Sequence, residues 1–332
     1  MRALLWIVLA ATAAWTGYWW VGASQIESGV KAWIAQQPPG VVSASSVEVH
    51  GIPNRFDLTV SDLVLADPAQ GVQVSSPFVQ VYAMTWKPWH VIAALPSGQV
   101  ITLPDQVVTV GSEKLRASVQ VHPSTALALN ELVGEASGVK LTSDAGWTLG
   151  INTATVSMAE DVTRANTYRL GLRVAEIAPD AAVLQALAAT DLPDLVEEVF
   201  LDGHAVLTAP LDRNAVTSKP ELMALEIADA RVSWGALKFS AKGVLTAGPD
   251  GLAEGEIALR VEGWKRLPPI LVALGLVKPD VAPTVERMLG IVAQQGGDLE
   301  VLQIKLICKD GGMVLGPLPL GPAPRMRNMG GA

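Results

Sequence analysis

The chain has 332 residues, of which 50% are hydrophobic and 17% are charged, and it carries a formal net charge of −8. This length suffices for one large domain or two ordinary ones with a sizeable core. The acidic balance, without any run of Lys or Arg, argues against nucleic-acid binding and against electrostatic docking onto anionic lipid. The single cysteine, Cys308, excludes an internal disulfide and is expected to be a small core side chain.

The first feature along the chain is an uncharged apolar run of about 21 residues, from Ala3 to Ala23. A helix of this length spans the hydrocarbon core of a bilayer, which is about 30 Å thick. Arg2 is the only charged side chain before the run, so the positive-inside rule places the N-terminus in the cytoplasm. Aromatic residues that favour the headgroup layer cluster toward its far end: Trp15, Tyr18, Trp19 and Trp20.

The run therefore predicts a single-pass anchor in a bacterial inner membrane, with the bulk of the chain in the periplasm. The alternative is a secretory signal that is cleaved before Ser24. The run is longer than the core of a signal peptide, which usually has about 7–15 residues, and this favours the anchor. Both interpretations carry residues 24–332 across the membrane.

Three regions follow from this organisation. Residues 1–37 form the transmembrane or signal-anchor helix and its extension, which Pro38, Pro39 and Gly40 end. Residues 38–325 form a β-rich periplasmic domain, and residues 326–332 form a disordered tail. The helical extension is expected to lie against the domain that it carries.

Apolar and polar residues alternate along most of the predicted domain. The clearest examples are residues 55–61, 114–122, 167–175, 255–262 and 300–308. A period of two describes antiparallel strands with one apolar face and one solvated face. The expected fold class is therefore mainly β (α+β), with a long curled antiparallel sheet and a few packed helices.

Helices are expected to interrupt the sheet at five places. Their ranges are 89–95, 124–133, 181–199 (broken near Pro193), 264–275 and 283–295. The Pro/Gly-rich residues 316–324 are expected to be extended. Residues 51–74 and 235–261 share a strand, strand, turn, strand layout, which we treat as a hypothesis of internal repetition.

No residue set in the sequence carries a defensible chemistry. The four histidines, His50, His90, His122 and His204, lack metal-ligand spacing. Two acidic groups read as solvated surface: Asp191, Asp194, Glu197 and Glu198 near an expected helix start, and Asp57, Asp62 and Asp67 along a strand and turn. No Gly-x-Ser-x-Gly elbow surrounds Ser112 or Ser233. The sequence thus predicts no catalytic, cofactor-binding or metal-binding residue, and a protein that is not an enzyme.

Four phrases resemble a bacterial family, the domain of unknown function numbered 2125. They are HGIPNRFDLTVSDLVLADP (50–68), YAMTWKPWHVIAALPSG (82–98), residues 230–264 and KDGGMVLGPLPLGPAP (309–324). That family is similar to the AsmA-type envelope proteins, and the resemblance implies an inner-membrane helix followed by a periplasmic β-rich, AsmA-like domain. Larger AsmA-like proteins are thought to carry phospholipid along an apolar β-groove. This chain is too short to bridge an envelope, and the family offers no catalytic residue to carry over.

Two arrangements of the apolar strand face remain open. Either the helices at 181–199 and 264–295 cover it as a closed core, or it forms a partly open surface that accommodates lipid. The leading hypothesis is a non-enzymatic, inner-membrane-anchored protein that binds, senses or helps move lipid, with phospholipid as the candidate ligand. The alternative is an envelope scaffold that docks another envelope protein through a sheet edge or the apolar face.

Overall fold

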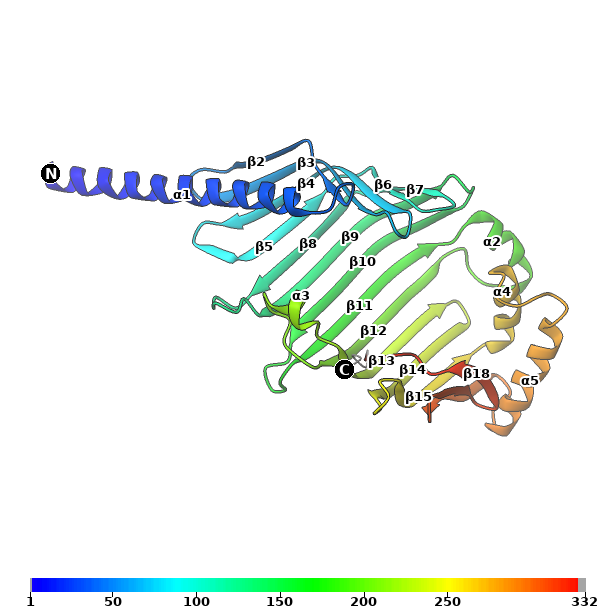
Figure 1. Cartoon of the computed structure of the whole chain (residues 1–332). Helices are drawn as coiled ribbons and strands as arrows, with labels where there is room; N and C mark the ends of the chain where they lie inside the picture. The colour runs from blue at the N-terminus through cyan, green and yellow to red at the C-terminus, as the bar shows by residue number, and fades with distance from the viewer. Residues whose placement is uncertain (1, 328–332) are drawn as a thin grey trace. The chain divides into compact units, whose positions relative to one another are not determined.

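The computed structural model describes residues 2–327 and is mainly antiparallel β with a few helices, which confirms the expected fold class (Figure 1). The chain divides into two compact units. Unit 1 comprises Met1–Pro123 and Leu132–Gly146. Unit 2 comprises Ser124–Glu131 and Trp147–Ala332.

Unit 1 begins with one long helix, α1 (Arg2–Gln36), which ends just before the predicted stop at Pro38. Its C-terminal part packs on the sheet of unit 1, where Trp19, Ala23, Val49 and Phe56 form a core cluster. The helix approaches the sheet closely, because a Cβ atom at position 22 would lie 2.7 Å from the ring of Phe56. The helix therefore continues beyond the apolar run to Gln36, and Ile26 of this extension packs against the same cluster.

The sheet of unit 1 is built from nine strands. They are β1 (Val42–Ser43), β2 (Ser46–His50), β3 (Arg55–Asp67), β4 (Val72–Met84), β5 (Lys87–Leu95), β6 (Gln99–Thr102), β7 (Val107–Gly111), β8 (Lys114–Val121) and most of β9 (Leu129–Ser143). Strands β1 and β2 pair with successive parts of β3, which pairs with β4. Beyond β4 the sheet forks into a β5–β8 pair and a β6–β7 pair, and β7 pairs with β9.

The sheet of unit 2 is a meander in which each strand pairs antiparallel with the next. Its strands are β10 (Thr148–Glu160), β11 (Thr167–Ala178), β12 (Val196–Leu207), β13 (Leu222–Trp234), β14 (Leu237–Ala247), β15 (Ala253–Glu262), β16 (Val301–Lys309), β17 (Gly312–Leu315) and β18 (Leu318–Pro322). The strands from β10 to β15 lie side by side in chain order in Figure 1.

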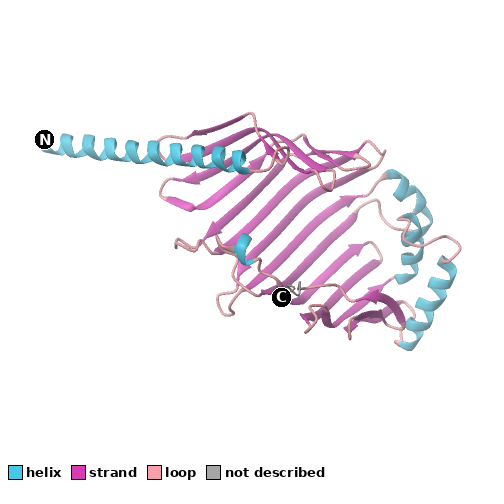
Figure 2. Ribbon diagram, in the orientation of Figure 1, coloured by secondary structure: helices cyan, strands magenta, loops and turns pink. Residues whose placement is uncertain are grey.

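The helices of unit 2 are short. They are α2 (Ala181–Ala186), η1 (Ala188–Thr190), α3 (Ala215–Ser218), η2 (Trp264–Arg266), α4 (Leu267–Ala273) and α5 (Ala282–Gln295). In Figure 2, α2, α4 and α5 gather at one end of the strands of this unit. Helices α4 and α5 confirm the predictions at 264–275 and 283–295.

Two predicted helices are wrong. Residues 89–95 belong to β5, because Val91 pairs with Ala83 on one side and Val119 on the other. Residues 124–133 form a turn followed by the start of β9, and Leu127 has a φ of 51° that no helix accepts. The periodicity of these short apolar runs fits a buried helix face and a buried strand equally well.

The predicted helix at 181–199 is correct only at its start. The helical part ends at Thr190, and β12 begins at Val196 after Pro193 has removed a backbone donor. As a result Glu197 and Glu198 lie on a strand, and Asp191 terminates a short 3₁₀-helix in the left-handed region with a φ of 53°.

The two windows compared for repetition each contain one hairpin rather than three strands. Residues 55–84 and 237–262 each form two long strands joined by a Pro/Gly turn. In the first window, Asp62 has a φ of 48° but lies inside a continuous β3.

The C-terminal Pro/Gly-rich segment is extended, as predicted, but its residues also pair in the β17–β18 hairpin. Of the predicted tail at 326–332, residues 328–332 lie outside the described residues. Met326 and Arg327 are held by backbone hydrogen bonds, in which their N–H groups donate to the carbonyl of Gly251 at 2.9 and 3.1 Å.

Candidate functional site

The most distinctive surface of unit 2 is an apolar face that crosses seven neighbouring strands, from β10 to β16. The pairing register aligns its side chains in rows that run across the strands. One row consists of Val156, Leu172, Leu201, Ala230, Ala241, Leu259 and Ile304. We call this surface, with the two parallel rows described next, the apolar face of unit 2.

Two further rows lie on either side of the first. On one side lie Ala154, Val174, Val199, Val232, Phe239, Val261 and Leu302, and on the other lie Met158, Leu170, Gly203, Ile227, Gly243, Ile257 and Leu306. No polar side chain interrupts any of the three rows. Seven strands at a spacing of about 4.8 Å give each row a length of roughly 29 Å.

Other elements of unit 2 cover mainly the β13–β16 part of this face. At one end of the strands, α4 and α5 pack on a cluster that includes Leu237, Val261 and Leu302. At the other end, the C-terminal segment packs through Ala323. Within residues 2–327, none of the three core clusters includes a side chain of β10 or β11, and Val156 is 47% exposed. The helices therefore close only a part of the face, and the part on β10 and β11 stays uncovered.

One aromatic residue marks the limit of the uncovered part along β11. Tyr168 is fully buried, and its hydroxyl accepts a hydrogen bond of 2.8 Å from the backbone N–H of Leu211 in the loop that carries α3. Burial is the main cause that raises the pKa of this phenol. The loop thus covers the apolar face at the end of β11, away from α2.

Unit 1 carries a second apolar face, and it starts beneath α1. Its rows are Val49, Leu58, Val81, Ala93 and Ala117, and next to them Phe56, Ala83, Val91 and Val119. The helix buries Val49 and Phe56, whereas the side chains on β4, β5 and β8 are only half-buried. A hollow of about 320 Å³ lies between α1 and β2, with Trp19, Trp20, Ala23 and Val49 on its apolar side and Ser24, Glu27, Ser28 and Lys31 on its polar side.

Three aromatic side chains fasten α1 to the turns of unit 1. The indole N–H of Trp15 donates to the carbonyl of Pro53 at 3.0 Å, and that of Trp19 donates to Arg55 at 2.6 Å. The hydroxyl of Tyr18 donates to the carbonyl of Thr85 at 3.0 Å. These side chains donate hydrogen bonds to the protein's own backbone. The interpretation of the sequence assigned them only to the headgroup layer and missed this role. The clustering of three aromatic residues within about one helical turn is the sequence signal that could have indicated this role.

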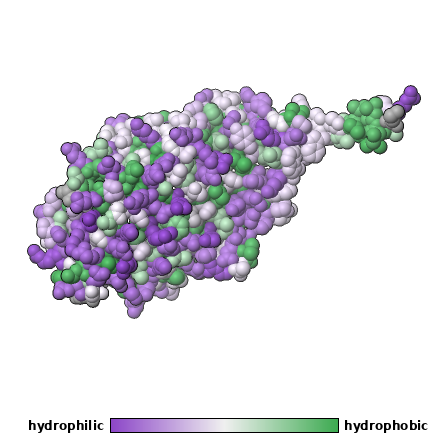
Figure 3. All heavy atoms as spheres, turned by 180° about the vertical axis from the view of Figure 1, so that it is seen from behind, coloured by the Kyte–Doolittle hydropathy of each residue, from purple (hydrophilic) through white to green (hydrophobic). Residues whose placement is uncertain are grey.

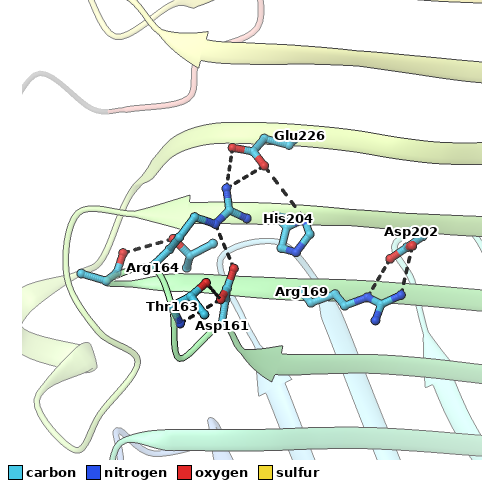
Figure 4. A network of polar contacts seen from close by, with 9 residues as sticks. Asp161, Thr163, Arg164, Arg169, Asp202, His204 and Glu226 are labelled. Carbon is cyan, nitrogen blue, oxygen red and sulfur yellow. Dashed lines mark hydrogen bonds and ion pairs between the residues drawn. The ribbon is translucent and has the colours of Figure 1, made fainter.

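The opposite face of the unit 2 strands is charged and self-paired (Figure 4). Arg164 donates to both oxygens of Glu226 at 2.9 Å and to Asp161, also at 2.9 Å. Arg169 makes two hydrogen bonds to Asp202, at 2.9 and 3.1 Å. In the view from behind, most of the visible surface is hydrophilic, and apolar residues gather on the free end of α1 (Figure 3).

The pairing lowers the pKa values of the acids in this network. The Thr163 hydroxyl and then Arg164 hold the pKa of Asp161 down at about 2, from an ordinary value of 3.8. Arg169 is the main cause that lowers the pKa of Asp202. Both carboxyls are therefore ionised at neutral pH and have no proton to donate, so the network suits a structural role better than acid catalysis.

A dependence of stability on pH follows from Asp161. Because its folded pKa lies below the ordinary one, its contacts stabilise the fold fully above pH 3.8, and this stabilisation is lost as the pH falls toward about 2. Thermal unfolding monitored by circular dichroism should show the melting temperature falling over this interval. An Asp161→Asn variant should show a smaller fall, and an equal fall in both proteins would contradict the assignment.

The histidines and acidic residues that were considered in the sequence do not come together in one site. His50 lies 3.3 Å from Glu48, His90 contacts the Ser118 hydroxyl at 2.8 Å, and His204 lies 3.9 Å from Glu226. No group of three or more potential metal ligands occurs among the described residues.

The acidic candidates are likewise engaged separately. Asp57 pairs with Arg55, Glu198 with Arg173, and Asp62 accepts a hydrogen bond from Ser45. Glu198 was expected near a helix start, but it lies on the polar side of β12, where it pairs across to β11. Cys308 is buried as expected, and burial raises the pKa of its thiol.

The fold and these surfaces define a class: a mainly antiparallel β protein with uncovered apolar strand faces and an N-terminal helix long and apolar enough to cross a membrane. Over residues 19–324 the chain matches the family described as an uncharacterized protein conserved in bacteria, DUF2125, and it belongs to that family. The sequence-based assignment to this family is thus confirmed. No curated protein and no solved structure matches the chain.

Proposed function

We propose that this protein is anchored in the bacterial inner membrane by α1, faces the periplasm, and binds or helps move lipid on its apolar strand faces without catalysis. The observation that carries the proposal is the uncovered part of the apolar face of unit 2. A sheet with one apolar face normally buries it against a second layer. Beyond the loop that covers Tyr168, the described part of unit 2 supplies no such layer on β10 and β11, so a ligand or a partner is the natural cover.

The dimensions and chemistry of the face suit acyl chains. Its rows cross seven strands over roughly 29 Å, and the part on β10 and β11 is open to an acyl chain. Contact removes apolar area from water at roughly 0.8 kcal/mol per methylene, so five buried methylenes contribute about 4 kcal/mol. Acyl chains need no polar partner, and the three rows offer none.

The junction between α1 and the sheet supports an uncleaved anchor. Cleavage before Ser24 would remove Trp19 and Ala23, which form half of the four buried residues in the core cluster of unit 1. It would also remove three hydrogen bonds from the helix to the turns. In addition, the apolar face of unit 1 begins under this helix, which offers acyl chains an apolar surface beside the anchor.

The resemblance to AsmA-type envelope proteins that we inferred from the sequence agrees with this proposal, since larger proteins of that type are thought to carry phospholipid. The alternative is a scaffold that docks another envelope protein on the same apolar face. One observation supports the scaffold alternative: the uncovered face is three rows wide, which is enough for an amphipathic helix of about 10 Å diameter.

Photo-crosslinking in native membranes tests the proposal and separates the alternatives. Benzoylphenylalanine would replace Val156 on the apolar face, and Thr155, which is exposed on the opposite face of the same strand, provides the matched control. Lipid adducts at position 156 that exceed those at 155 would support lipid binding. One dominant protein adduct at position 156 would support the scaffold. Equal and weak crosslinking at both positions would contradict both functions.

A further inference from the structure

The apolar run of α1 is longer than the part of the helix that stands free of unit 1. The run extends from Ala3 to Ala23, but its contacts with the sheet begin at Trp15. The free part from Ala3 to Ala14 has about 12 residues and a length of roughly 18 Å. A hydrocarbon core of about 30 Å needs about 20 residues. The rest of the apolar run, from Trp15 onward, must therefore also lie in the membrane, although this part of the helix already contacts the sheet of unit 1.

The protein at that level consists of two turns. The β2–β3 turn, residues 51–54, receives the hydrogen bond from Trp15, and the β4–β5 turn receives the one from Tyr18. The turns are joined to each other, because the backbone N–H and the hydroxyl of Thr85 both donate to the carbonyl of Asn54 at 3.1 Å. Together they form one tip, which comprises Gly51–Asn54 and Met84–Trp86 and which we call the double-turn tip.

The composition of the double-turn tip is that of a membrane-interface segment. It has no charged residue, and its apolar side chains point outward: Ile52 is 53% exposed and Trp86 is 56% exposed. The first charged residues after the two turns are Arg55 and Lys87, whose long stems allow the charge to reach the headgroup layer. An exposed tryptophan and an exposed isoleucine on one tip favour the boundary between headgroups and acyl chains.

We propose that the double-turn tip inserts into the outer boundary of the lipid bilayer beside α1 and forms a second membrane contact of the protein. The bilayer is the occupant because the anchor itself brings it to this level: aromatic side chains at positions 15 and 18 hold the tip next to an apolar helix that is still within the membrane. Two contacts, one spanning and one shallow, fix the tilt of unit 1 relative to the membrane. This inference needs only that α1 spans the bilayer and is independent of lipid transport.

The test places a fluorescent bimane label on the full-length chain at Ile52→Cys or at Trp86→Cys. Gln70→Cys, in the exposed turn at the other end of the β3–β4 hairpin, provides the control. Native Cys308 stays in place because it is only 2% exposed, and the unsubstituted chain serves as the labelling blank. Each protein is reconstituted in phosphatidylcholine and phosphatidylglycerol vesicles that contain a doxyl quencher at a shallow or a deep acyl position.

We expect the shallow quencher to reduce the fluorescence at positions 52 and 86 at least twofold, more than the deep quencher does, and to leave position 70 unchanged. Quenching at 52 and 86 that does not exceed that at 70 would overturn the proposal. Stronger quenching by the deep probe would also overturn it, because the tip would then lie in the bilayer interior. Either labelled position suffices, so the test survives if Trp86→Cys fails to fold.

Discussion

Glutamine at positions 156 and 172 should weaken lipid retention by about a hundredfold. Val156 and Leu172 are direct cross-strand partners on the uncovered part of the apolar face. If each substitution removes contact equal to about two methylenes at roughly 0.8 kcal/mol each, the pair loses about 3 kcal/mol. The measurement is the amount of lipid that co-purifies with the full-length protein after gentle extraction, determined by native mass spectrometry.

The control pair for this prediction is Thr153→Gln with Thr155→Gln. Both threonines are exposed and lie on the opposite face of β10, so the same number of amides is added without touching the apolar rows. We expect both double variants to fold, because none of these residues belongs to a core cluster of the described chain. Equal lipid loss in the two variants would show that the apolar face does not hold the lipid.

A single methyl group at position 243 should destabilise unit 2. Gly243 lies in β14, and a Cβ atom there would sit 2.2 Å from the carbonyl oxygen of Glu256 and 2.6 Å from the Cα atom of Ile257. The obstacle is the backbone of the neighbouring strand, which cannot turn aside as a side chain would. Overpacking of this kind costs about 1–3 kcal/mol, and we expect Gly243→Ala at the upper end of that range.

The matched control is Gly312→Ala, also in a strand of unit 2. A Cβ atom at position 312 would lie 3.6 Å from the nearest backbone oxygen, which is an ordinary contact. Its free energy of unfolding should therefore stay close to that of the unsubstituted chain. Chemical denaturation followed by circular dichroism would compare the three proteins. A Gly243→Ala variant as stable as the control would mean that the strands separate more easily than the close approach implies.

The sequence predicted the two-faced character of the strands well, because a period of two is a local property. In β11 the alternation places Leu170, Leu172 and Val174 on one side and Arg169 and Arg173 on the other. Pairing with β10 and β12 preserves that division. The membrane-length helix was equally readable, since length and the absence of charge are sufficient signals.

The predictions that failed concern short apolar runs and contacts distant in sequence. Residues 89–95 become a strand because β4 and β8 flank them, and nothing within the run itself reveals those neighbours. The same holds for the pairing of Arg164 with Glu226, which are 62 positions apart and meet only once the register is set. The extent to which the apolar face is covered also could not be predicted from the sequence, because it depends on where α4 and α5 pack.

The neighbour-to-neighbour order of the strands in unit 2 has a consequence for biogenesis. In the proposed topology, export with the anchor first delivers β10 before β11 and each later strand after its template. Every arriving segment can hydrogen-bond at once to the one just delivered, so no segment waits for a distant partner. Assembly can then keep pace with export, and the growing edge is vulnerable to wrong pairing only until the next strand emerges.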